Sequence, residues 1–163
     1  MIVPAPIVLP SASPSPAPVV LYIFQPPADW QQSPVPADLT AYNVVALYFA
    51  PDAGSFRSNV NVVRDVLQDP NETLAQVVAQ GRKFFEDHSN TLGASHAEKL
   101  CNGAIDGWYL ESAGTLGLQA TSRVQTVLVD RGTEYIATYS RGVGSDPDPA
   151  AVKALDTLCP QPQ

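Results

Sequence analysis

The sequence predicts an α+β domain in which two helices pack on a mainly antiparallel sheet of six to seven strands. Runs that alternate apolar and polar residues follow one another through short turns, which is typical of strands joined by hairpins. Only two segments show the three- and four-residue spacing of an amphipathic helix, one in mid-chain and one near the end. Helices inserted among hairpins, rather than alternating with strands, favour α+β over a parallel α/β sheet.

The first half of the predicted domain holds three strands and a helix. The strands are expected at residues 17–24, 43–51 and 56–68. The proline-rich stretch that joins the first two strands is expected to be loop. In the third strand, Asn59 and Asn61 face one side and Val60 and Val62 the other, so one face is apolar.

The predicted helix begins just after this strand. Thr73 and Gln76 fit a capping box, in which each side chain satisfies a backbone amide of the other residue. Apolar residues then recur on one side of the helix, at Leu74, Val77, Val78, Gly81, Phe84 and Phe85. This stripe is wide enough to cover part of a sheet.

The second half is predicted to be a meander of hairpins that ends in a helix. Asn102-Gly103 and Arg131-Gly132 are the predicted turns, because Asn and Gly tolerate the positive φ of tight hairpins. The last helix is expected to start with Asp148 as N-cap and Pro149 as first helical residue.

Length and charge limit the classes of function. The chain has 163 residues, of which 45% are hydrophobic, enough for one domain with a buried core. With 16 acidic and 9 basic residues its net charge is −7, which repels phosphate backbones, so nucleic acid is not an expected partner. There is no run of about 18 apolar residues, so no transmembrane segment is predicted in this chain.

Residues 1–18 contain six prolines and are predicted to be a Pro/Ser-rich disordered tether ahead of a single domain over residues 19–160. The segment has neither the basic start nor the uninterrupted apolar core of a signal peptide. If it is a tether, a signal peptide or lipid anchor is expected upstream of Met1. A plain disordered tail is the alternative.

Three stretches resemble the PsbP-like domains, a group that includes the Mog/PsbP, DcrB and LpqN types. YIFQPPADW resembles their opening strand, turn and tryptophan, and FRSNVNVVRD resembles their Asn-Val strand. RVQTVLVDRGTEYIATYS resembles their paired strands around a glycine turn. The resemblance covers most of residues 20–158. It implies an antiparallel sheet between helices, and relatives that are bacterial lipoproteins, secreted proteins and photosystem assembly subunits, mostly without enzymatic activity.

Two cysteines, Cys101 and Cys159, bear on the compartment. A disulfide between them would close a loop of nearly sixty residues and stabilise the fold by about 4 kcal/mol in the chain-entropy picture. We therefore predict a disulfide and an extracytoplasmic location, in the periplasm, the cell envelope or the medium. The alternative is two buried reduced thiols in a cytosolic protein.

The motifs favour neither a metal centre nor catalysis. His88, His96 and Cys101 fall on a helix end, a linker and a hairpin, without the tight spacing of a zinc site. Ser140 lies in TYSRG, which lacks the first glycine of a nucleophile elbow. No catalytic residue, metal or cofactor is predicted.

The candidate binding residues are polar side chains on one sheet face. Arg57, Asn59, Asn61, Arg123 and Gln125 would form polar rows if their strands are neighbours. Trp30, in its proline-rich loop, is added as an exposed aromatic. The alternatives are a solvated or internally satisfied face, and Trp30 as an ordinary core residue.

These observations leave three hypotheses for function. The preferred one is a non-catalytic envelope or secreted module that binds an unknown protein or small ligand. A hydrolase-like enzyme with a site assembled across strands is the second. The third is a cytosolic interaction domain of the same fold, with both cysteines reduced.

Overall fold

The computed structural model describes residues 21–51, 55–116 and 119–161. The predicted tether, residues 1–18, lies outside the described residues, as does the first half of the predicted strand 17–24. The strands are β1 (Tyr22–Ile23), β2 (Gln31–Ser33), β3 (Val44–Phe49), β4 (Asn59–Val66), β5 (Thr91–Leu100), β6 (Ile105–Leu116), β7 (Gln119–Asp130), β8 (Thr133–Gly142) and β9 (Cys159–Pro160). The helices are α1 (Ala37–Thr40), α2 (Leu74–Asp87) and α3 (Pro149–Leu155).

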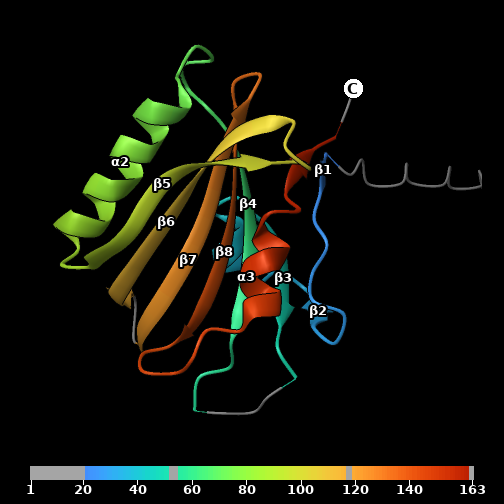
Figure 1. Cartoon of the computed structure of the whole chain (residues 1–163), viewed down its shortest axis with the longest axis vertical. Coiled ribbons are helices and arrows are strands. Elements are labelled where there is room, and N and C mark those ends of the chain that lie inside the picture. The colour runs from blue at the N-terminus through green and yellow to red at the C-terminus, as the bar shows by residue number, and fades with distance from the viewer. Residues whose placement is uncertain (1–20, 52–54, 117–118, 162–163) are drawn as a thin grey trace, which may run out of the picture.

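Seven strands form one sheet in the order β2-β3-β4-β8-β7-β6-β5, and every neighbouring pair is antiparallel. The predicted class, α+β with a mainly antiparallel sheet, is confirmed. Figure 1 shows the long strands β5 to β8 curving together, with α2 along one side and α3 on the other.

The face under α3 carries the larger core. Ala151 and Leu155 of α3 and the following Leu158 pack on alternate residues of the central strands. These are Val60, Val62, Val124, Leu128, Ala137 and Tyr139. The hydroxyl of Thr126, also on this face, donates a hydrogen bond to the Leu155 carbonyl at 3.2 Å. Leu155 is the last residue of α3, so this bond provides a partner for a carbonyl at the C-terminal end of the helix.

Helix α2 covers only part of the opposite face. Val77 and Val78 pack on Val127 of β7, with Trp108 and Ile136 at the margin. The chain leaves β4 near the middle of the sheet and returns at β5 on its edge, so α2 contacts β5, β6 and β7. The part of this face on β4 and β8 lies beside the helix rather than under it (Figure 1).

Local signals in the sequence set the ends of these elements as predicted. Thr73 caps α2, and the reciprocal bonds of the capping box with Gln76 are both formed. The Asp148 carboxylate accepts from the Ala150 amide at 2.9 Å, and Pro149 opens α3. Asn102 and Arg131 have positive φ in the two predicted hairpin turns.

Three features differ from the sequence-based expectation. The predicted loop after the first strand contains β2, which pairs with β3, and the short helix α1, which begins just after Pro36. Proline is tolerated beside an edge strand and at a helix start, so proline content alone did not indicate loop. Within the described residues, β1 is two residues long and pairs with β9 rather than joining the main sheet.

Candidate functional site

A cavity of about 770 Å³ lies between α2 and the uncovered part of the sheet. Its floor is formed by β4, β8, β7 and β6, and one wall by α2. Leu39 and Tyr42, at α1 and just after it, and Phe56, just before β4, complete the lining. A volume of this size suits a small-molecule ligand.

The strand register arranges the floor in rows that change from polar to apolar. The first row runs Asn59, Ser140, Arg123 and Ser112, and the second runs Asn61, Thr138, Gln125 and Leu110. The third row is Val63, Ile136, Val127 and Trp108, and the fourth begins with Asp65 and Glu134. All the members except Ser112 and Asp65 line the cavity. An elongated ligand lying along the strands would therefore meet polar groups at one end and apolar ones next.

Arg123 is the most deeply buried charged group of this floor, with 5% of its surface exposed. Its Nε donates to Ser112 Oγ at 3.3 Å, its Nη1 to Thr121 Oγ1 at 2.6 Å, and its Nη2 to Asn90 Oδ1. All three acceptors are neutral. Burial lowers the pKa of the Arg123 guanidinium, because the charged form loses contact with water.

The backbone at Gly114 allows Asn90 to approach Arg123. Gly114 has φ of +152°, and a Cβ built there would lie 2.6 Å from Asn90 Oδ1. Asn90 follows α2, is itself buried, and donates from Nδ2 to the His88 carbonyl at 3.0 Å. Because residue 114 has no side chain, Asn90 can lie close enough to accept a hydrogen bond from Nη2 of Arg123.

Two of the amide side chains on the floor form hydrogen bonds within the protein. Gln125 Nε2 donates to Thr138 Oγ1 at 2.9 Å across neighbouring strands. At the start of β4, Asn59 Nδ2 donates to the Arg57 carbonyl at 3.3 Å. These bonds hold donors and acceptors in place along the floor.

Glu134 lies at the other end of the cavity from Arg123. Burial raises the pKa of this carboxyl to about 7, and the nearby charges of Asp65 and Glu72 act in the same direction. The two ends of the cavity therefore differ in charge, with a cation at one and a weak acid at the other.

Two exposed aromatic rings, Tyr42 and Phe84, line the mouth of the cavity. Tyr42 is 75% exposed and Phe84 is 49% exposed, which is unusual for large apolar side chains. Gly81 of α2 also lines the cavity, and a Cβ placed there would have nothing within 4 Å. The helix therefore leaves open space where most residues would have filled it.

The structure brings four of the predicted binding residues to this cavity: Asn59, Asn61, Arg123 and Gln125. Arg57 is exposed and lies two residues before β4, where its Nε donates to the Ala50 carbonyl at 2.7 Å. Its guanidinium lies 5.1 Å from the Phe49 ring centroid.

Trp30 lies elsewhere, in the core under α3. It is 7% exposed and contacts Tyr139 edge to face, with ring centroids 6.0 Å apart. Its amide donates to the Pro27 carbonyl at 3.0 Å, a turn that carries the ring inward. Of the two interpretations of Trp30 that the sequence allowed, an exposed binding residue and an ordinary core residue, the structure supports the second.

Sequence reasoning missed the polar residues of β8, Thr138 and Ser140. Alternation in EYIATYS places both on the same side of the strand as Glu134, which was the available signal. Their position between the Asn and Arg residues follows only from the strand order, because β8 pairs with both β4 and β7.

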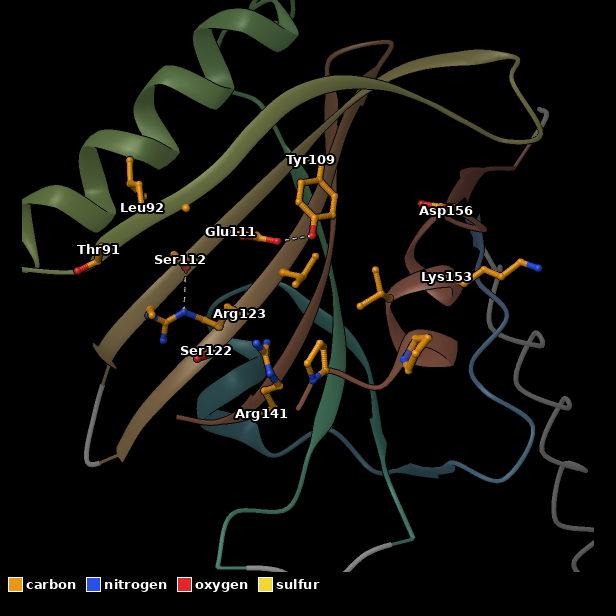
Figure 2. A pocket seen from close by; sticks show the side chains of 16 residues that line it. Thr91, Leu92, Tyr109, Glu111, Ser112, Ser122, Arg123, Arg141, Lys153 and Asp156 are labelled. Carbon is orange, nitrogen blue, oxygen red and sulfur yellow. Dashed lines mark hydrogen bonds between the residues drawn. The ribbon is translucent and has the colours of Figure 1, made fainter. Parts of the chain in front are cut away.

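A second cavity, of about 610 Å³, lies between α3 and strands β5 to β8 of the main sheet (Figure 2). The Tyr109 hydroxyl donates to Glu111 Oε1 at 2.7 Å, as Figure 2 shows. Burial and this bond raise the pKa of Tyr109. The lining mixes exposed Lys153 and Asp156 with Arg141, whose Nε donates to the Ser145 carbonyl at 3.0 Å. Arg123 lines this cavity too, but the other charged groups there are exposed or hydrogen-bonded locally, so it is the weaker candidate.

The two histidines line neither cavity. His88 ends α2, with Nδ1 2.7 Å from the Phe84 carbonyl, and His96 stacks on Tyr109 with ring centroids 4.7 Å apart. Across residues 21–51, 55–116 and 119–161, no three His, Cys, Asp or Glu side chains are grouped to hold a metal ion.

Cys101 and Cys159 form a disulfide whose Cα atoms are 5.2 Å apart, a usual separation for such a bond. The bond joins the β5–β6 turn to the segment after α3. None of the helices in the described part of the chain combines the length and apolar character needed to cross a membrane.

Comparisons with known proteins found similar structures but no similar sequence. No family model and no curated protein matches the sequence. A protein of unknown function from Pseudomonas aeruginosa is similar in structure, with TM-score 0.61 and 20% identity over 72% of this chain and 83% of that one.

Two further solved structures are similar at lower identity. The cyanobacterial PsbP protein of Synechocystis has TM-score 0.51 and 14% identity over 82% of this chain and 88% of its own. LpqN, involved in cell envelope biogenesis of Mycobacterium tuberculosis, has TM-score 0.51 and 14% identity over 85% of this chain and 83% of its own. The chain therefore has a PsbP-like fold, as its motifs predicted.

Proposed function

We propose that this chain is a non-catalytic extracytoplasmic module that binds a small amphiphilic ligand in the cavity beside α2. The observation that carries the proposal is the graded floor of that cavity, on which a buried polar row gives way to an apolar row along the same strands. Ligand sites in proteins are mostly apolar, with a few convergent polar groups that orient the ligand.

The mouth of the cavity supports the same function. Tyr42 and Phe84 expose large apolar surfaces that folding alone would favour burying. Gly81 is the one glycine of α2, and glycine in a helix costs about 1 kcal/mol relative to alanine. A ligand that fills the space above Gly81 and covers the two rings would account for both the exposed rings and the glycine.

The proposed location rests on the cysteines and on one similar protein. Disulfides persist in oxidising compartments and are rare in the cytosol, so the Cys101–Cys159 bond favours export. LpqN, which shares the fold, is described by its role in the cell envelope. The cytosolic alternative predicts both thiols reduced in the cell.

Titration with the neutral fluorescent probe N-phenyl-1-naphthylamine tests the binding function. We expect saturable binding to the purified protein, and its loss in Gly81→Phe, where the new ring occupies the cavity. Ala79→Phe is the matched control, because it places the same ring on the same helix at an exposed residue that does not line the cavity. Equal binding by both variants, or none by the wild type, would refute the proposal.

Trapping thiols with a mass-tagged maleimide in intact cells tests the location. We expect the protein to carry no tag unless it is first reduced, and to fractionate with the envelope or the medium. Two tags on the unreduced protein would show that it resides in a reducing compartment.

A further inference from the structure

We propose that the ligand carries a single carboxylate, which pairs with Arg123 at the polar end of the cavity, while its apolar chain lies along the sheet beside α2. This inference rests on the proposed function and deepens it. It names the chemical class of the ligand and the side chain that selects it.

The charge of Arg123 has no anionic partner within the described residues. The ion pairs found there join Lys83 to Asp87, Lys99 to Asp106, and Arg131 to Asp130. A charged group this deeply buried is ordinarily paired with an opposite charge, because neutral hydrogen bonds replace only part of its lost hydration. The Phe85 ring supplies a further weak attraction, with its centroid 5.4 Å from the guanidinium carbon.

The hydrogen bonds of Arg123 leave room for two more. A guanidinium has five N–H donors, one on Nε and two on each Nη. Ser112, Thr121 and Asn90 each accept one of them, from Nε, Nη1 and Nη2 respectively. One donor remains on each of Nη1 and Nη2, and such a pair matches the two oxygens of a carboxylate.

The remaining charges favour one negative charge over two. Glu134 is the other ionisable side chain on the floor of this cavity, and it is an acid. The protein as a whole carries a net charge of −7. A phosphate monoester would place about two negative charges beside a single guanidinium, in a field that opposes them. A carboxylate matches the single cation.

The dimensions of the floor fit a medium-chain fatty acid. Arg123 and Val127 are four residues apart on β7, which is about 14 Å of strand. Next to Arg123 an elongated ligand passes Gln125 and Thr138, and then reaches Val127, Ile136 and Val63. Val77 and Val78 of α2 line the same end of the cavity, so the tail would contact the side of the helix as well as the sheet.

A structural role for Arg123 is the competing explanation. In that role Arg123 only ties β7 to Asn90, and no ligand charge is needed. The two explanations differ in what they predict for ligands of the same length and different headgroups.

The test compares decanoate with decanol as competitors of N-phenyl-1-naphthylamine. We expect the wild type to bind decanoate roughly ten- to hundred-fold more tightly than decanol, the usual effect of a charge-assisted hydrogen-bond pair. Arg123→Gln should remove this preference and leave decanol affinity unchanged, which also shows that the cavity is still folded. Arg123→Lys keeps the positive charge but loses the paired N–H donors of the guanidinium, so it should keep part of the preference for decanoate. Arg82→Gln is the control, since Arg82 is an exposed arginine of α2 that does not line the cavity.

The outcomes separate this inference from the proposed function. If decanol and decanoate bind equally, or if Arg123→Gln keeps the preference, the carboxylate inference is wrong while cavity binding stands. Failure of both ligands to displace the probe overturns the inference. Binding of the probe itself, with its loss in Gly81→Phe, still decides the proposed function.

Discussion

The guanidinium of Arg123 lies over the ring of Phe85, with its central carbon 5.4 Å from the ring centroid. This contact joins β7 to the last turn of α2 at the polar end of the cavity. Phe85 is buried while its neighbour Phe84 is half exposed at the mouth, so adjacent rings on one helix have different surroundings. Both rings line the cavity, but Phe84 is half exposed to solvent whereas Phe85 is buried against Arg123.

Replacing Phe85 with leucine should destabilise the protein more than the same change at Phe84. Phe85→Leu removes the ring under Arg123 and leaves a small void, which we expect to cost about 1–2 kcal/mol. Phe84→Leu changes a half-exposed side chain and should cost less than about 0.5 kcal/mol. Urea unfolding followed by circular dichroism measures both values. Equal losses would show that the contact between Arg123 and Phe85 contributes nothing measurable.

Two glycine-to-alanine changes should have opposite signs. Gly114→Ala places a methyl group against Asn90 Oδ1 at a backbone angle that favours glycine, and we expect a loss of about 1–3 kcal/mol. Gly81→Ala adds a methyl group in open space within α2 and should stabilise the protein by about 0.5–1 kcal/mol. Thermal unfolding of the two variants beside the wild type provides the comparison. A neutral Gly114→Ala would show that Asn90 does not need its close approach to residue 114.

The sequence predicts the polar floor only within each strand, because strand periodicity shows which residues share a face. Alternation places Asn59 and Asn61 on one face and does the same for Arg123 and Gln125 on their own strand. Whether the two pairs share a cavity depends on which strands are neighbours. In the structure β8 lies between them and supplies Thr138 and Ser140, a relation set by long-range pairing.

The other differences from the sequence-based predictions also involve long-range contacts. Trp30 enters the core because Tyr139, more than a hundred residues later, offers a surface to its ring. Strand β1 pairs with β9 near the end of the chain, and two-residue strands carry no detectable period. Caps and hairpin turns were predicted correctly because their causes lie within four residues of sequence, as at Thr73 and Asn102.

The stability of the protein should decrease between about pH 4.5 and pH 7, in part because of Glu134. The pKa of this carboxyl rises on folding from 4.5 to about 7, so the folded protein holds the proton more tightly than the unfolded chain does. Below pH 4.5 both states are protonated. As the pH rises the unfolded chain ionises first, and the free energy of unfolding decreases until the folded protein also ionises near pH 7.

Glu134→Gln should remove part of this decrease. Because the carboxyl is only partly buried, we expect a gain on the order of 1 kcal/mol above pH 7, and no gain below pH 4.5. Glu98, whose pKa burial also raises to about 7, remains in the variant, so some pH dependence should persist. Urea unfolding at a series of pH values measures the difference. A gain that is the same at all pH values would indicate that the glutamine acts through packing and not through ionisation.

Reduction of the Cys101–Cys159 disulfide should destabilise the whole fold. The bond closes a loop with a sequence separation of 58 residues, and the chain-entropy estimate for a loop of that size is about 4 kcal/mol. Typical domains have only about 5–15 kcal/mol in total, so the reduced protein should unfold at much lower urea concentration. A variant with alanine at both cysteines should match the reduced wild type and be insensitive to dithiothreitol.

The same bond should also control where the fold opens first. It anchors the segment after α3, whose strand β9 pairs with β1 and whose Gln161 amide donates to the Leu21 carbonyl at 3.2 Å. Without the bond, hydrogen exchange in β1 and β9 should become faster than in the centre of the sheet, because so short a pairing is held mainly by its anchor. Uniform acceleration in β1, β9 and the central strand β7 would contradict this, since it would place the whole effect of the bond on the unfolded chain.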